Sequence, residues 1–96
     1  MRITQEQISL AVQIIRNRFP DASVWLFGSR VDDAKRGGDF DFYVETGRAD
    51  NIAVDKALTR GDLNDALGIS TDLVVNNHRH DRPIYTIARQ TGVRLA

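Results

Sequence analysis

Cysteine is absent from the chain, so disulfides and thiolate metal sites are excluded, and the composition fits a reducing compartment. The formal net charge of +0 removes any general electrostatic attraction to nucleic acid. No apolar run approaches the roughly 20 residues that span a bilayer, and the first residues lack the apolar core of a signal peptide. We therefore expect a cytoplasmic protein that binds no membrane and has no strong general affinity for nucleic acid.

The composition is that of a small globular domain. Hydrophobic residues make up 42% of the chain and charged residues 27%, which is ordinary for a soluble domain with a core. A chain of 96 residues is near the lower limit for independent folding, so we expect a single domain over residues 1–96. A sheet and its covering helices would use nearly all of it, which leaves no room for a separate acceptor-recognition domain.

Three segments have the apolar spacing of amphipathic helices. Thr4 has the features of an N-cap for the first helix, and Gln7 completes a capping box with it. Gly68 follows the second helix in the position of a C-terminal cap. The third helix begins with a proline in its first turn, which is a favoured position. The expected helices are residues 5–18, 52–67 and 83–91.

The remaining apolar runs are expected to form strands. In the second of them, alternate apolar side chains point to the core, and Asp39, Asp41, Tyr43 and Glu45 point to an opposite, polar face. Tyr43 fits two roles equally there, stacking on a base or packing in the core. The first two strands are too closely joined for a crossover helix, so they should be antiparallel. The expected strands are residues 23–27, 39–45 and 71–75, with residues 93–95 as an edge strand. The fold class is then α/β, a small mixed sheet with flanking helices.

Asp39 and Asp41 form the most informative pair in the chain. Residues two apart on a strand share a face, so these carboxylates lie close together. Two unit charges ~4 Å apart repel by about 4 kcal/mol at an effective dielectric of ~20, so the pair needs a cation, a shared proton or a nearby arginine. An isolated pair of this kind is more often two solvated acids on an edge strand. Mg²⁺, or Mn²⁺ in its place, is the expected cation if the neighbouring residues bind phosphate.

The neighbouring residues fit phosphate binding. Gly28 leaves an apolar strand and permits a close backbone approach, and Ser29 adds a hydroxyl beside a possible nest of backbone N–H groups. Arg30 would either neutralise a polyphosphate or remain in water. Asp72 begins the third strand, and it joins Asp39 and Asp41 only if that strand lies beside the second.

These motifs together resemble the signature of the DNA polymerase beta-like nucleotidyltransferase superfamily. Gly28 and Ser29 precede a spacer, residues 30–38, and then the Asp-x-Asp pair. Leu67-Gly68 followed by Asp72-Leu73-Val74 is similar to the minimal nucleotidyltransferases, the MNT partners of MNT/HEPN toxin–antitoxin pairs. The residue before the first aspartate is often serine in the family and is Gly38 here, so the hydroxyl that would make one phosphate or metal-water contact is missing.

The resemblance implies a polymerase beta-like fold and a Mg²⁺-dependent transfer of a nucleoside monophosphate, most often AMP from ATP, to a hydroxyl. It implies catalytic and metal-binding roles for Asp39, Asp41 and Asp72, and nucleotide binding by Gly28, Ser29 and Arg30. The implied partner is a HEPN-type helical protein that carries the acceptor hydroxyl, and the chain would then be antitoxin-like.

Two other functions remain open in the sequence. The chain could be a binding module that covers a HEPN-type partner without chemistry, or a small-molecule nucleotidyltransferase, which the missing acceptor domain disfavours. The loop from His78 to Asp81 contains two histidines, but a surface role is more common than metal binding for such a pair without further ligands.

Overall fold

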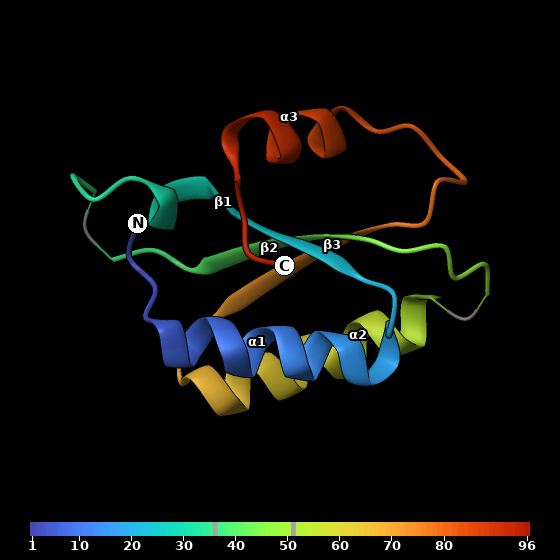
Figure 1. Cartoon of the computed structure of the whole chain (residues 1–96), viewed down its shortest axis with the longest axis horizontal. Coiled ribbons are helices and arrows are strands. Elements are labelled where there is room, and N and C mark those ends of the chain that lie inside the picture. The colour runs from blue at the N-terminus through green and yellow to red at the C-terminus, as the bar shows by residue number, and fades with distance from the viewer. Residues whose placement is uncertain (36, 51) are drawn as a thin grey trace.

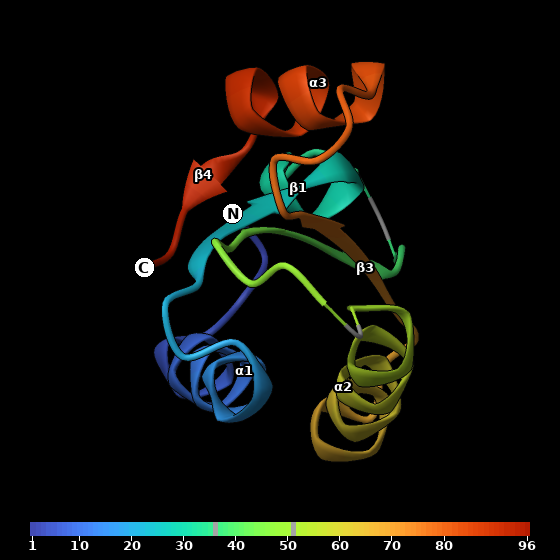
Figure 2. The ribbon, with the colours of Figure 1, turned by 90° about the vertical axis from the view of Figure 1, so that its right-hand side faces the viewer.

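A mixed sheet lies between two layers of helices (Figure 1). The computed structural model describes residues 1–35, 37–50 and 52–96. Helices α1 and α2 run side by side under one face of the sheet, and α3 crosses the other face (Figures 1 and 2). The elements in chain order are α1 (Gln5–Arg18), β1 (Ser23–Phe27), the single 3-10 turn η1 (Gly28–Val31), β2 (Phe40–Glu45), α2 (Ile52–Leu67), β3 (Thr71–Asn76), α3 (Pro83–Thr91) and β4 (Val93–Arg94).

The strand order is β3-β2-β1-β4. β1 and β2 are antiparallel, as their short connection predicted, and β4 pairs antiparallel with the outer side of β1. β3 is parallel to β2 because α2 carries the chain back across the sheet between them. The prediction of a small mixed α/β sheet with flanking helices is therefore confirmed, and β3 and β4 are its two edges.

The helix boundaries follow the signals in the sequence. The Thr4 hydroxyl accepts from the Gln7 backbone N–H at 3.1 Å, and the Gln7 side chain accepts from the Thr4 N–H at 2.9 Å. Gly68 ends α2 at a φ of +66°, and its N–H donates to the Asn64 carbonyl at 3.0 Å. Neither cap depends on distant residues, which is why both were predictable. Among the described residues, none of the helices combines the length and the apolar character that a membrane span requires.

The core on the α1 and α2 side matches the predicted pattern. Phe40, Phe42 and Val44 of β2 are fully buried there, packed with Val24 and Leu26 of β1. Apolar residues of both helices close this layer, among them Ala11, Ile15 and Leu63. β2 itself begins at Phe40, so Asp39 lies just before the strand.

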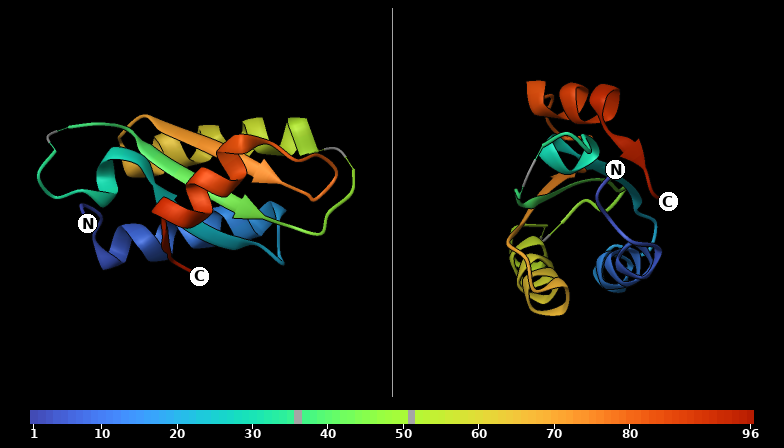
Figure 3. Two further views of the ribbon diagram at one scale, coloured as in Figure 1. Left: turned by 90° about the horizontal axis from the view of Figure 1, so that it is seen from above. Right: turned by 90° about the vertical axis from the view of Figure 1, so that its left-hand side faces the viewer.

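The opposite face of β2 is not polar along its length, contrary to the prediction. Tyr43 is only 1% exposed because α3 covers it, and its ring packs near Trp25, Phe27 and Ala88. The core role for Tyr43 is therefore the one that the structure supports. Only the two ends of this face remain open, and Asp41 lies at one of them. Figure 3 shows α3 crossing the middle of the strands and leaving their ends uncovered.

Candidate functional site

Asp41 and Asp72 stand side by side at one end of the sheet. They are register partners in the parallel pair of β2 and β3. Register partners on neighbouring parallel strands lie about 4.8 Å apart and point to the same face. The condition that the sequence set for Asp72 is thus met, because β3 does lie beside β2.

Asp39 precedes β2 and is exposed. Burial raises the pKa of Asp41, and the charges of Asp72 and then Asp39 raise it further. The negative charges of Asp72 and Asp39 therefore both act on the Asp41 carboxylate. Within residues 1–35, 37–50 and 52–96, no three potential ligands are gathered closely enough to hold one metal ion. A shared cation would require the carboxylates to draw closer together, and its attraction for each of them would favour that movement.

Gly28 lies against the carboxylate of Asp41. It opens η1 at a φ of +78°, and a β-carbon added there would overlap Asp41 Oδ2 and lie 3.1 Å from its Cγ. Only glycine permits both this conformation and this approach. The backbone of the Gly-Ser turn is therefore directly beside Asp41, as the nucleotide-binding prediction requires.

Ser29 is in close contact with Gly38. Gly38 has a φ of +90°, and a β-carbon added to it would overlap the Ser29 hydroxyl. This close contact with Ser29 explains why position 38 holds glycine instead of serine, because a side chain there would collide with the Ser29 hydroxyl. The Ser29 carbonyl accepts from Arg2 Nη2 at 3.0 Å, which ties the turn to the N-terminal segment.

Arg30 closes the turn rather than extending into water. Its Nε donates to the Gly38 carbonyl and its Nη1 to the Arg2 carbonyl, each at 3.2 Å. Its guanidinium carbon lies 4.5 Å from the centre of the Phe40 ring. These contacts give Arg30 a structural role in holding the turn to β2. Its assignment to nucleotide binding remains a prediction.

Helix α2 brings two cations to the site that the sequence analysis missed. A hollow of about 390 Å³ is lined by Asp41 and Asp72 together with Lys56 and Arg60. Arg60 Nε donates to the Thr71 carbonyl at 2.8 Å, and its Nη2 lies 3.4 Å from Asp72 Oδ1. Asp72 therefore has a nearby arginine as a counter-charge. The available signal was the four-residue spacing of Lys56 and Arg60, which places both on one side of a helix.

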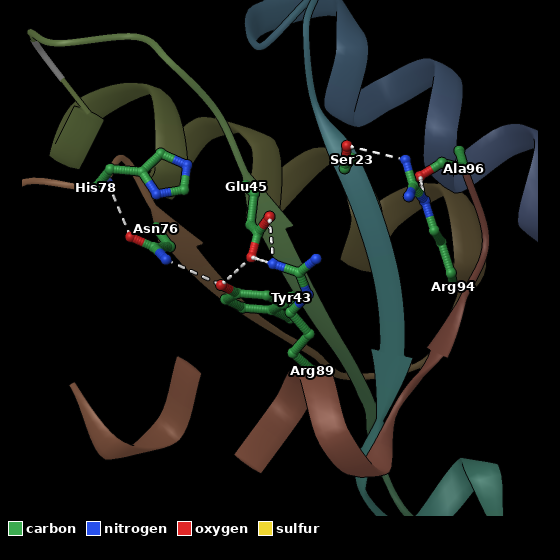
Figure 4. Close-up of polar contacts among 8 residues, drawn as sticks. All are labelled: Ser23, Tyr43, Glu45, Asn76, His78, Arg89, Arg94 and Ala96. Carbon is green, nitrogen blue, oxygen red and sulfur yellow. Dashed lines mark hydrogen bonds and ion pairs between the residues drawn. The ribbon is translucent and has the colours of Figure 1, made fainter. Parts of the chain in front are cut away.

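A different hollow lies at the other end of β2 and β3. Its volume is about 550 Å³, and the loop from His78 to Asp81 forms one wall. The Tyr43 hydroxyl donates to Glu45 Oε2 at 2.8 Å and accepts from Asn76 Nδ2 at 3.0 Å, while Arg89 pairs with Glu45 (Figure 4). Burial raises the pKa of Tyr43 to about 12. This network satisfies buried polar groups of the sheet, and His78 and His80 form no metal cluster within the described residues.

Known structures share this fold. Chains from the tri-AMPylated Shewanella oneidensis HEPN toxin in complex with MNT antitoxin match at a TM-score of 0.71 and 21% identity, over 98% of this chain and 72% of the other. The toxin–antitoxin complex MntA–HepT matches at 0.73 and 22%, over 97% and 72%. A mutant of the toxin–antitoxin complex MntA–HpeT matches at a TM-score of 0.76 and 20% identity, over 93% of this chain and 71% of the other. At these identities the likeness establishes the fold.

No curated protein matches the sequence. The model of the nucleotidyltransferase domain family, in contrast, matches residues 8–93, which span the Gly-Ser turn, all three aspartates and the covering helices. This chain therefore belongs to the nucleotidyltransferase domain family, with the fold found in MNT antitoxin complexes.

Proposed function

We propose that this protein transfers AMP from ATP to a hydroxyl side chain of a HEPN-type helical partner protein, in a Mg²⁺-dependent reaction. The observation that carries the proposal is the pairing of Asp41 with Asp72 beside the backbone of Gly28. Membership of the nucleotidyltransferase family supports nucleotidyl transfer in general. Family membership specifies neither the nucleotide nor the acceptor, and both are part of the proposal.

The donor set at this end of the sheet suits Mg²⁺, which prefers carboxylate oxygens together with substrate phosphates. Asp39 and Asp41 would hold the ion with Asp72 completing the site. The raised pKa of Asp41 is the expected property of an acid crowded by other acids, and a cation would relieve it. When bound, the ion would neutralise charge on the phosphates.

Different residues of the chain would bind the phosphates and accept the proton. The Gly28-Ser29 turn holds the phosphates of ATP against the end of β1. The acceptor oxygen attacks the α-phosphorus, the bond to the bridging oxygen of pyrophosphate breaks, and pyrophosphate leaves. The proton of the acceptor hydroxyl passes to the carboxylate of Asp72. Catalysis of this kind depends mainly on positioning and on neutralising charge.

The partner assignment comes from the complexes in which the structural neighbours are found. One is a tri-AMPylated HEPN toxin in complex with its MNT antitoxin, and another is the toxin–antitoxin complex MntA–HepT. Those complexes support a helical partner with an AMP-accepting hydroxyl for this chain as well. The protein would then act as an antitoxin by modifying its toxin.

The test is transfer of label from α-labelled ATP, with Mg²⁺, to the helical protein encoded beside this chain. We expect label on a hydroxyl side chain of that protein. Asp39→Ala and Asp41→Ala should abolish labelling with the fold retained, and Asp72→Ala should reduce transfer more than ATP binding. Asp65→Ala is the matched control, since Asp65 is an exposed acid of α2 outside the site.

Two outcomes would replace the proposal. Tight association with the partner but no label on any product would indicate a binding module without chemistry. Label that appears only on a small metabolite would indicate a stand-alone transferase.

A further inference from the structure

The phosphate-binding turn and the two strand aspartates lie in a row across the sheet, one at each of three neighbouring strands. Gly28 directly follows β1, Asp41 lies on β2 and Asp72 on β3, and the strand order places β2 between the other two. In an in-line displacement the attacking and leaving oxygens lie on opposite sides of the phosphorus. If pyrophosphate leaves from the side of Gly28, the acceptor arrives from the side of β3. This step rests on the proposed function above.

A groove lies on that side of the sheet. β3 is the edge strand, with α2 below it and α3 above it (Figure 2). A hollow of about 510 Å³ between these two helices adjoins the hollow of about 390 Å³ that contains Asp41 and Asp72. Lys56, Val74 and Ile84 line both, so the two hollows are continuous. We call the larger one, from Ile52 of α2 to Ile84 of α3, the α2–α3 groove.

The α2–α3 groove is aliphatic and positively charged. Ile52, Val75 and Ile84 supply apolar surface, and Lys56 and Arg82 supply the permanent cations. No acidic residue lines this groove in the described part of the chain. Neither Lys56 nor Arg82 forms an ion pair within those residues. The charge is therefore complementary to an acidic segment, and the aliphatic walls suit apolar side chains.

The outer backbone of β3 is already hydrogen-bonded at the two ends of the strand. The Thr71 N–H donates to Asn64 Oδ1 at 2.7 Å, and the Thr71 carbonyl accepts from Arg60. At the other end, the Val75 carbonyl accepts from the Tyr85 hydroxyl at 3.4 Å. Side chains from α2 and α3 thus cap both ends of this edge, as proteins do to prevent strand addition. At these two ends, a bound segment must be held by its side chains.

We propose that the α2–α3 groove receives an acidic, partly apolar segment of the acceptor protein and directs its hydroxyl side chain past Ile84 to Asp72. Protein is favoured over RNA because aliphatic walls separate the few cations, whereas a nucleic-acid backbone requires a track of positive charge. ATP itself is accounted for at the Gly28-Ser29 turn, on the opposite side of Asp41.

The test uses short fluorescent peptides and the full chain. One peptide has a central tyrosine flanked by aspartate, glutamate, leucine and valine, and its match has lysine in place of every acid. We expect the acidic peptide to bind at least about fivefold more tightly by fluorescence anisotropy, because two cations each contribute a modest attraction. Lys56→Glu combined with Arg82→Glu should reverse the preference, and Ile84→Ser should weaken both peptides.

Lys35→Glu is the matched control. It makes the same change in charge as Lys56→Glu but lies in the loop before β2, outside the groove, so the preference should persist. Saturating ATP and Mg²⁺ should leave peptide affinity unchanged, because the two ligands occupy opposite sides of Asp41.

Several results would overturn the proposal. These are failure of both peptides to bind, equal affinity for them, or an unchanged preference in the Lys56→Glu, Arg82→Glu double variant. Displacement of the peptide by ATP would make the groove a nucleotide pocket, and tighter binding of single-stranded RNA than of the acidic peptide would make the acceptor a nucleic acid. Failure of the proposed function would appear separately, as absence of any thermal shift with ATP and Mg²⁺.

Discussion

Gly28 and Asp41 are in contact at the point where β1 ends, and the contact leaves no space for a β-carbon on residue 28. The two residues are neighbours because Phe27, immediately before the glycine, is the register partner of Asp41. The geometry of the turn and the position of the carboxylate are therefore coupled. A change at residue 28 must move the acid, the turn or both.

Gly28→Ala should abolish nucleotidyl transfer. The left-handed conformation alone would cost roughly 1–3 kcal/mol in an alanine, and the clash would also displace the Asp41 carboxylate. Gly37→Ala is the control, because Gly37 has a φ of +61° and no atoms near the added carbon. Chemical denaturation should show a loss of stability in both variants, larger for Gly28→Ala because of the clash, and a labelling assay should show lost activity only for Gly28→Ala. Full activity in Gly28→Ala would refute the coupling.

Asp41→Asn should stabilise the metal-free protein at neutral pH. The folded pKa of Asp41 is raised above its ordinary value of 3.8 by burial first, then by Asp72 and Asp39. The folded state therefore holds this proton more tightly, and stability decreases as pH rises from 3.8 through the folded pKa. The asparagine removes that penalty. Thermal melts without metal should show a higher Tm than the parent, and the increase in Tm with Mg²⁺ and ATP should be reduced. A lower metal-free Tm would contradict this view of the site.

Phe42→Ala should strongly destabilise the domain. Phe42 is fully buried in the layer facing α1 and α2, so its truncation leaves a cavity that costs about 3–5 kcal/mol. Val54→Ala on α2 is the control, since Val54 is 65% exposed and its truncation should cost under about 0.5 kcal/mol. Circular dichroism melts would measure both. Equal stability of the two variants would mean that the assigned facing of β2 is wrong.

Alkali should destabilise the protein through Tyr43. Burial is the main cause that raises the pKa of this phenol from 10.0 to about 12. The folded state retains the proton longer than the unfolded state, so the contribution of Tyr43 is complete below pH 10 and is lost between about 10 and about 12. Tyr43→Phe should remove this pH dependence and cost about 1–2 kcal/mol at neutral pH, because Asn76 and Glu45 each lose the hydrogen bond to the Tyr43 hydroxyl. The free energy of unfolding of the parent protein and of Tyr43→Phe, measured as a function of pH, would check this prediction. An identical alkaline decline in the two would exclude Tyr43 as its cause.

Features set by neighbours along the chain could be predicted from the sequence. The Thr4 capping box, the Gly68 cap and the antiparallel pairing of β1 with β2 depend on short segments, and each is present in the structure. The Gly-Ser turn and the Asp-x-Asp pair were recognisable because phosphate and metal chemistry requires those residue types in that order.

Features set by contacts between distant segments came only from the tertiary structure. Nothing local indicates that α3 packs on Tyr43, and this contact turned an expected polar face into a second core layer. The same holds for Arg30, which ties η1 to Arg2 and Gly38, and for Arg60, which reaches Asp72 across the edge of β3. The sequence by itself determined which acids and which turn are present. The tertiary structure decided which of these groups meet, through the register of β3 against β2 and the sheet face on which α3 packs. Register and packing depend on how whole helices and strands bury their apolar surfaces, which no short segment of sequence specifies.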